Sequence, residues 1–94
     1  MTFHITVSPK PGTNPTAETF HQAAEWLSAN QRFFQSIGGF KDGSGEYAVV
    51  SVPDKQALDA LMAAYPAKAH VNFDVHEVTE IDAHMAGLIK QFSK

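Results

Sequence analysis

The sequence contains no cysteine, no cluster of basic residues and no long hydrophobic run, and each absence excludes a class of protein. Without cysteine, the 94-residue chain forms no disulfide, thiolate metal site or cysteine nucleophile. Its seven Lys and Arg are scattered along a chain of net charge −3, so the electrostatic footprint of a nucleic-acid-binding protein is missing. No stretch approaches the ~20 apolar residues that span a bilayer, and no signal-like segment opens the chain. We therefore expect a cytoplasmic protein that binds neither nucleic acid nor membrane.

The chain is nevertheless apolar enough to fold. Hydrophobic residues make up 44% of it and seven residues are Phe, a composition that excludes intrinsic disorder. Its length is that of one domain with a real core. We expect a single domain over residues 1–94.

Alternation of apolar and polar residues marks the stretch His70 to Val78 as a half-buried strand. The apolar positions, which should face a core, are Val71, Phe73 and Val75. The polar positions on the other face are Asn72, Asp74 and His76. Residues 2–8 alternate in the same way and predict a first strand, with His4 and Thr6 on its polar face.

Three helices are expected around these strands. Asn14-Pro15-Thr16 supplies start signals for a helix that ends near residues 28–30. Its apolar residues at helical spacing are Ala17, Phe20, Ala23, Ala24 and Leu27. Asp54 caps a second helix, whose apolar stripe comprises Leu58, Leu61, Met62 and Tyr65. Pro66 stops this helix. A third, amphipathic helix follows Thr79, which forms a pair resembling a capping box with Asp82. The apolar face of this last helix comprises Ile81, Met85, Leu88, Ile89 and Phe92.

A hairpin is expected in the middle of the chain, with strands over residues 32–41 and 46–52. The turn between them is Asp42-Gly43-Ser44-Gly45, whose glycines tolerate the positive φ of tight turns. Gly38-Gly39 inside the first of these strands indicates a bulge or a close approach of the backbone. The apolar run at residues 48–50 favours a central position for the second strand.

The order of elements predicts an α+β fold of the ferredoxin-like βαββαβ type, with an antiparallel four-stranded sheet, both helices on one face and an added C-terminal helix. In that topology the first and last strands are neighbours, so His4 and Thr6 should lie beside the polar positions of residues 72–76. The helix-free face is solvated, covered by another chain or covered by the last helix. The apolar character of residues 46–52 favours a second copy packed face to face.

Several stretches resemble muconolactone isomerase-like proteins. They are Gly45–Pro53, Ala57-Leu58, Leu61-Met62, Tyr65-Pro66 and Val71–Val75, with Phe3-His4-Ile5 at the start of the chain. The resemblance implies the dimeric α+β barrel superfamily, in which two ferredoxin-like sheets pack face to face and pockets lie between sheet and helices or inside the barrel. Residues 32–45 depart from the isomerase pattern, which has a Trp-rich and Arg-rich strand there, and the terminal helix is an addition. The resemblance therefore does not identify the substrate.

The candidate catalytic residues are His4, Asp74 and His76. Histidine titrates near neutral pH, and a neighbouring carboxylate fixes its tautomer and raises its basicity. Such a pair moves a proton between carbons of an activated small molecule, which is what a lactone isomerase requires. The candidate ligand contacts are Thr6, Tyr47, Ser51 and Asn72. The alternative is that these polar groups hydrogen-bond across a dimer interface or face water.

No metal or cofactor is predicted. His and Asp side chains suit several divalent ions, but no spacing such as HExxH occurs. We predict a homodimer with a small-molecule ligand, acting as an isomerase on an unsaturated lactone or a related carbonyl compound. Two further functions stay open: a non-catalytic dimeric ligand-binding or interaction module, and a cofactor-free monooxygenase whose aromatic pocket would include Trp26 and Tyr47.

Overall fold

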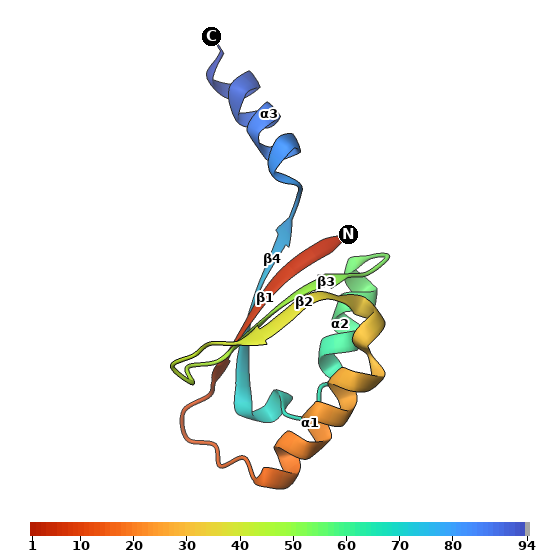
Figure 1. Ribbon diagram of the computed structural model, residues 1–94, viewed down its shortest axis with the longest axis vertical. Coiled ribbons are helices and arrows are strands. Elements are labelled where there is room, and N and C mark those ends of the chain that lie inside the picture. Colours follow the sequence, from red (N-terminus) through yellow and green to blue (C-terminus); the bar gives the residue numbers. More distant parts are fainter. Residues whose placement is uncertain (94) are drawn as a thin grey trace.

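The computed structural model, which describes residues 1–93, contains one four-stranded antiparallel sheet with two helices packed on one of its faces (Figure 1). The strands are β1 (Thr2–Pro9), β2 (Phe34–Gly39), β3 (Glu46–Ser51) and β4 (Val71–Val78). The helices are α1 (Ala17–Ala29), α2 (Lys55–Ala63) and α3 (Ile81–Phe92), with short 3₁₀ helices η1 (Gln31–Phe33) and η2 (Lys68–His70). The strand order is β2-β3-β1-β4, so the expected ferredoxin-like α+β fold and the central position of β3 are confirmed.

The pairing of β1 with β4 fixes which polar residues meet. His4 lies directly opposite His76, and Thr6 lies opposite Asp74. Residues paired across an antiparallel ladder point to the same face of the sheet. The predicted neighbours therefore lie side by side on the face that α1 and α2 leave uncovered.

The core lies between the sheet and α2. It consists of Phe3 and Ile5 from β1, Ala48 and Val50 from β3, and Val52 and Leu58. Leu58 is fully buried, and Asp54 starts its helix by accepting a hydrogen bond of 2.8 Å from the backbone N–H of Ala57. Both the predicted cap and the predicted apolar stripe of this helix are confirmed, although the helix ends before Tyr65.

Helix α1 begins as predicted but packs less closely than its sequence suggests. Thr16 caps it and forms a reciprocal capping box with Thr19. Of its apolar residues only Ala23 is buried, and Phe20 is 54% exposed. The second half of the helix, with Trp26 and Leu27, carries the contact with the rest of the molecule.

The β2–β3 hairpin differs from the prediction in where its irregularity lies. Its bulge falls between Phe34 and Ser36, before the two glycines. The close approach predicted at the glycines is present, because a Cβ atom at Gly38 would lie 2.8 Å from the ring of Tyr47. The ring of Tyr47 therefore lies over a position that only glycine leaves free.

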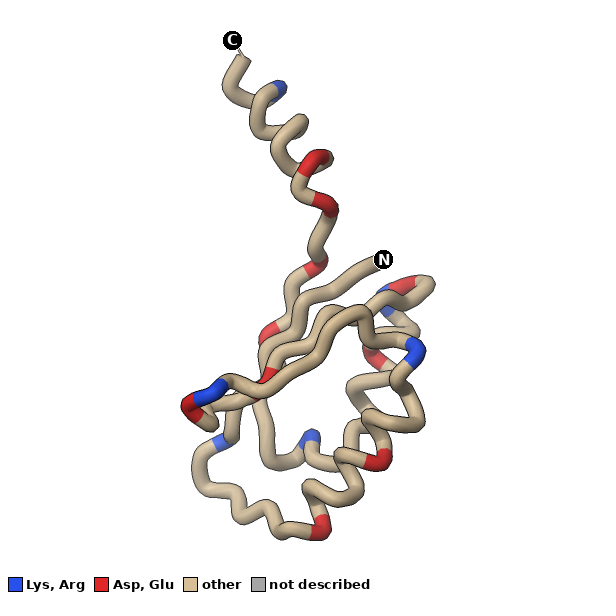
Figure 2. Tube along the Cα trace, viewed as in Figure 1, with Lys and Arg blue, Asp and Glu red and all other residues tan. Residues whose placement is uncertain are grey.

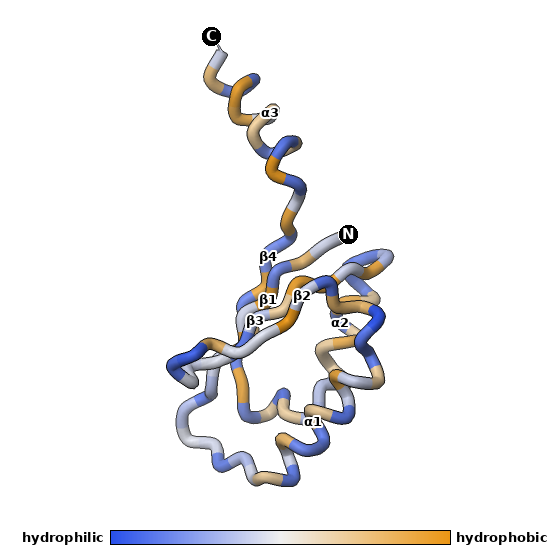
Figure 3. The backbone as a smooth tube through the Cα atoms, in the orientation of Figure 1, coloured by the Kyte–Doolittle hydropathy of each residue, from blue (hydrophilic) through white to orange (hydrophobic). Residues whose placement is uncertain are grey.

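Helix α3 stands clear of the sheet and of the other helices (Figure 1), so it does not cover the open face of its own sheet. The predicted capping box at its start is wrong: the helix begins at Ile81 after Glu80, and no side chain caps it. Extended backbone after β4 carries the helix past the end of the sheet, which makes the molecule 55 Å long and 27 Å wide. Its hydrophobic residues (Figure 3) lie in solvent, with Ile81 67%, Ile89 64% and Phe92 77% exposed.

Lys and Arg are scattered along the chain, as Figure 2 shows. Asp74, Glu77, Glu80 and Asp82 follow one another through β4 and the start of α3 with no Lys or Arg between them. Within residues 1–93, no helix has both the length and the apolar character needed to cross a membrane.

Candidate functional site

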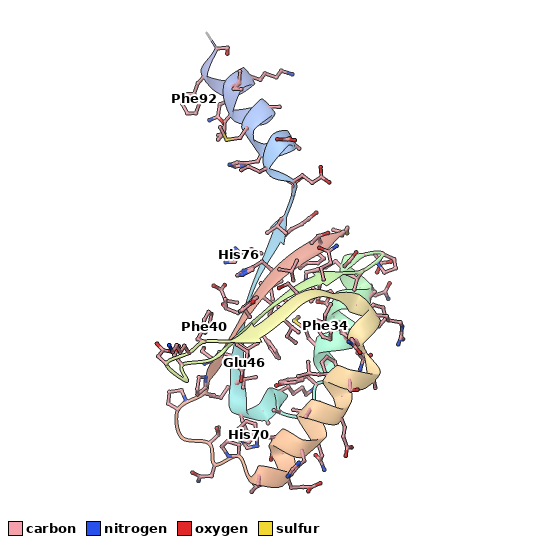
Figure 4. All side chains as sticks on the ribbon, viewed as in Figure 1. Phe34, Phe40, Glu46, His70, His76 and Phe92 are labelled. Carbon is pink, nitrogen blue, oxygen red and sulfur yellow. The ribbon has the colours of Figure 1, made fainter. Side chains whose placement is uncertain are left out.

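The predicted catalytic residues share the open face of the sheet. His76 Nε2 lies 3.3 Å from Asp74 Oδ2, and the two side chains are 65% and 72% exposed. Figure 4 shows His76 pointing away from the side of the sheet that carries the helices. His4, opposite His76 on β1, is half-buried. The sheet thus brings the three residues together on its open face.

The predicted ligand contacts lie on the same face but are not all near these residues. Thr6 is paired with Asp74, and Asn72 lies opposite Ser8. Tyr47 lies opposite Thr6 on the other side of β1, with its ring 6.1 Å from that of Phe40. Ser51 lies at the far end of β3, opposite Thr2. No three His, Asp or Glu side chains of residues 1–93 lie close enough together to hold a metal ion, and His4, Asp74 and His76 are no exception.

A cavity lies on the opposite side of the sheet, between the strands and helices α1 and α2. Its volume is about 610 Å³, within the range that small-molecule sites occupy. Ile37, which lines it on β2, is 46% exposed, so the cavity reaches solvent along this edge of the sheet. Its apolar wall is formed by Ile5, Val7, Leu27, Phe34, Ala48, Val50, Leu61, Met62 and Phe73.

A chain of aromatic rings runs through the wall of this cavity. Trp26 packs edge to face against Phe34, with centroids 6.1 Å apart, and against Tyr65, with centroids 5.2 Å apart. Tyr65 in turn meets Phe73 at 5.9 Å. Edge-to-face packing is the favourable arrangement for such rings, and it leaves flat apolar faces for a ligand.

Two polar groups of chemical interest also line the cavity, Glu46 and Tyr65. Glu46 is paired with Val7 and Gly39 and has the parity of Ala48, so it points to the helix side of β3. Figure 4 shows Glu46 and Phe34 on that side, below the sheet. Burial of the Tyr65 hydroxyl raises its pKa above 10.0, and the Glu46 carboxylate raises it further.

The arrangement combines a hydrogen-bond acceptor with a hydrogen-bond donor. A glutamate carboxylate accepts a proton, and a tyrosine with a raised pKa keeps its proton and donates a hydrogen bond. Gln31, Gln35 and Ser36 add neutral polar groups to the wall. Tyr65 is half-buried and Glu46 is exposed, so water competes less for the tyrosine hydroxyl than for the carboxylate. The site is suited to a small, flat, unsaturated molecule with an oxygen atom to bind.

The sequence analysis did not single out Glu46 or Tyr65. A signal for Glu46 was present, because it has the same parity in its strand as the apolar residues Ala48 and Val50, although its side chain is exposed. Tyr65 was assigned to the apolar stripe of its helix, although it lies just after the helix and reaches the cavity. Trp26 and Tyr47 were considered as parts of an aromatic pocket. Both residues border the cavity, but only Trp26 belongs to its chain of aromatic rings, because the side chain of Tyr47 lies on the open face of the sheet.

No protein-family model and no curated protein matches the sequence. Solved structures with the same fold include 5-chloro-2-hydroxyhydroquinone dehydrochlorinase from Burkholderia phenoliruptrix in complex with 2,5-dihydroxybenzoquinone. Its TM-score is 0.75 at 14% identity, over 88% of this chain and 98% of that one. Muconolactone isomerase is similar as well, with a TM-score of 0.70 at 19% identity, over 85% of this chain and 90% of that one. The sequence resemblance to muconolactone isomerase-like proteins is thus confirmed at the level of the fold.

Proposed function

We propose that this protein is an isomerase that binds a small unsaturated lactone, or a related carbonyl compound, in the cavity between the sheet and helices α1 and α2. The observation that carries the proposal is the presence of Glu46 and Tyr65 in one aromatic-lined cavity. The two structures with the same fold are named for enzymes of small oxygenated rings, and one of them holds 2,5-dihydroxybenzoquinone. Ligands of this size and shape match a cavity of about 610 Å³.

The proposed reaction needs no cofactor. The Glu46 carboxylate removes a proton from a carbon atom conjugated with the carbonyl group, and the electron pair of that C–H bond moves to the carbonyl oxygen. Tyr65 donates a hydrogen bond to this oxygen, which stabilises the negative charge of the enolate. Glu46 then returns the proton to a different carbon of the conjugated system. The product is an isomer of the substrate, so atoms and electrons balance.

The open face offers a second acid-base set, formed by His4, Asp74 and His76. The 3.3 Å contact between His76 Nε2 and Asp74 Oδ2 supports it, because a carboxylate partner fixes the tautomer and orientation of a histidine ring. Thr6, Tyr47, Ser51 and Asn72 are its proposed ligand contacts. On this face a non-catalytic role in joining two copies is the competing proposal. The two acid-base sets lie on opposite sides of the sheet, so substitutions distinguish them.

The test of the reaction is the isomerisation of unsaturated lactones, or their proton exchange in D₂O, followed by NMR. Loss of a general base lowers a reaction rate by about 10²–10⁴-fold. We therefore expect Glu46→Gln to lower the isomerisation rate by a factor in this range, and Tyr65→Phe to lower it by a smaller factor. Asp74→Asn and His76→Ala should stay within about twofold of the wild-type rate. If Asp74→Asn or His76→Ala abolished turnover while Glu46→Gln kept it, the active site would lie on the open face instead.

We further propose that two copies form a homodimer. Helix α3 exposes Ile81, Ile89 and Phe92, and an isolated helix of 12 residues is barely stable in water unless its apolar face packs against something. A second copy of the chain supplies such a surface. Light scattering after gel filtration should give a mass of two chains, and Ile89→Asp should shift the equilibrium toward one chain, with His84→Asp as the control on the same helix. A one-chain mass for the wild type at micromolar concentration would refute the dimer.

A further inference from the structure

We infer that Glu46 makes the cavity selective for uncharged ring compounds and excludes those that carry a carboxylate. This inference rests on the proposed ligand-binding function and names the chemical class of its ligand. Glu46 lines the cavity together with two other ionisable residues, Tyr47 and Tyr65. Of the three, only Glu46 carries a carboxyl group.

The position of Glu46 decides the sign of the electrostatic field inside the cavity. The carboxylate projects from β3 to the helix side of the sheet and, although it is exposed to solvent, borders a cavity whose other walls are mainly apolar. Charges near a protein surface interact more strongly than in bulk water, because the protein on one side of them is less polarisable. The Glu46 carboxylate raises the pKa of Tyr65, which means that it disfavours a second negative charge, the Tyr65 phenolate, in the cavity.

The Glu46 carboxylate repels a carboxylate on the ligand, just as it disfavours a phenolate on Tyr65. An uncharged lactone, enone or hydroxylated ring avoids this repulsion and keeps the contacts with the rings of Trp26, Phe34 and Phe73. A hydroxyl group on such a ring strengthens binding further, because it donates a hydrogen bond to the Glu46 carboxylate. Among the described residues that line the cavity, none is Lys, Arg or His, so the repulsion has no local counter-charge within one chain.

The chain carries its own reporter for the test. Trp26 is its one tryptophan and lies in the cavity wall, so its fluorescence reports occupancy of this cavity directly. The probes are two butenolides that are transparent at the excitation wavelength, one with a γ-methyl group and one with a γ-carboxymethyl group. Both are titrated into the 94-residue chain at neutral pH, at low and at high salt.

We expect the γ-methyl lactone to bind at least about tenfold more tightly than the γ-carboxymethyl lactone at low salt. Glu46→Gln should narrow this ratio to about threefold or less, mainly through stronger binding of the carboxylate. High salt should also reduce the ratio of the two affinities in the wild type, because salt screens the repulsion. This comparison tests the charge effect without a substitution. Glu80→Gln, which removes the same charge at the start of α3, is the matched control and should leave the ratio unchanged.

The possible failures are distinct. Equal or tighter binding of the γ-carboxymethyl lactone by the wild type would overturn the charge selectivity while leaving the ligand-binding function intact. An unchanged ratio in Glu46→Gln would remove Glu46 as its source and overturn the inference in the same way. If neither lactone changed the Trp26 fluorescence in a saturable way, the proposed ligand-binding function would fall, and the inference with it.

Discussion

Tyr65 and Glu46 line the same cavity, and burial of the tyrosine hydroxyl, together with the nearby carboxylate, keeps the Tyr65 pKa above its ordinary value. The two residues come from different elements, β3 and the turn after α2, and meet only because the sheet and the helix layer close over one space. This relationship leads to the first prediction.

The pH dependence of stability should carry a component from Tyr65. Its folded pKa is raised, so between about pH 10 and the folded pKa the folded chain holds a proton that the unfolded chain has released. The contribution is therefore fully present below about pH 10 and is lost as the pH rises through the folded pKa. Urea denaturation at pH 8 and pH 11 should show a larger loss of stability for the wild type than for Tyr65→Phe; an equal loss in both would contradict the raised pKa.

The same pKa is directly visible by absorbance. The chain has two tyrosines, so Tyr47→Phe leaves Tyr65 as the sole source of phenolate signal. Its titration midpoint should lie above 10.0, because burial and then the Glu46 carboxylate both disfavour the phenolate. Adding Glu46→Gln should lower the midpoint without returning it fully to 10.0, since burial is the larger cause. An unchanged midpoint in the double variant would show that the carboxylate does not act on Tyr65.

Truncation of Leu58 should be strongly destabilising. Its side chain is fully buried between α2 and the sheet, so Leu58→Ala removes apolar burial and leaves a void, which costs about 2–5 kcal/mol. Gln56→Ala on the same helix is exposed and should change the free energy of unfolding by less than about 0.5 kcal/mol. Denaturant titrations of both variants measure the difference, and a Leu58 effect near that of Gln56 would contradict the assigned core.

The cap of α2 should matter more than the ion pair on its surface. Asp54→Ala removes the acceptor for the Ala57 N–H, which typically costs about 1 kcal/mol. Asp59→Ala removes an exposed pair with Lys55 at 2.8 Å, which is worth less than about 0.5 kcal/mol. Both variants lose one carboxylate from the same helix, so thermal or denaturant unfolding compares the two directly. The reverse order of effects would be inconsistent with the observed cap.

Gly45 should not tolerate a side chain. Its φ is +154°, and a Cβ atom there would lie 2.0 Å from the carbonyl oxygen of Val7 on the paired strand. Gly45→Ala should therefore destabilise the protein by more than about 1 kcal/mol. Gly87, inside α3, has no heavy atom within 4 Å of such a Cβ, so Gly87→Ala should be neutral or stabilising by about 0.5–1 kcal/mol. Unfolding of the two variants tests this contrast, and a neutral Gly45→Ala would show that β1 and the turn move apart easily.

Much of this architecture was determined by local patterns in the sequence. Alternation with period two assigned Val71, Phe73 and Val75 to the core side of β4, and all three are half-buried beside exposed polar neighbours. The order of elements then made β1 and β4 neighbours, which brought His4 and His76 together. These predictions succeeded because the side-chain direction in a strand depends only on position within it.

Other features depended on how the elements pack. The helical stripe of α1 predicted burial of Phe20, but the helix contacts the rest of the fold mainly through its second half, and Phe20 stays exposed. Local patterns could not predict the direction of α3 either. Its apolar face indicates that the helix packs against another surface, but it does not identify that surface.

The sequence by itself thus determined the strands, the helices, their order and the face to which each strand residue points, because periodicity, caps and turns act over a few neighbouring residues. Only the tertiary structure decided that a cavity remains between the sheet and α1, that Tyr65 reaches it from beyond the end of α2, and that Glu46 lies in the same wall. The physical reason is that a cavity is a property of the distances between packed layers, which no single stretch of the chain contains.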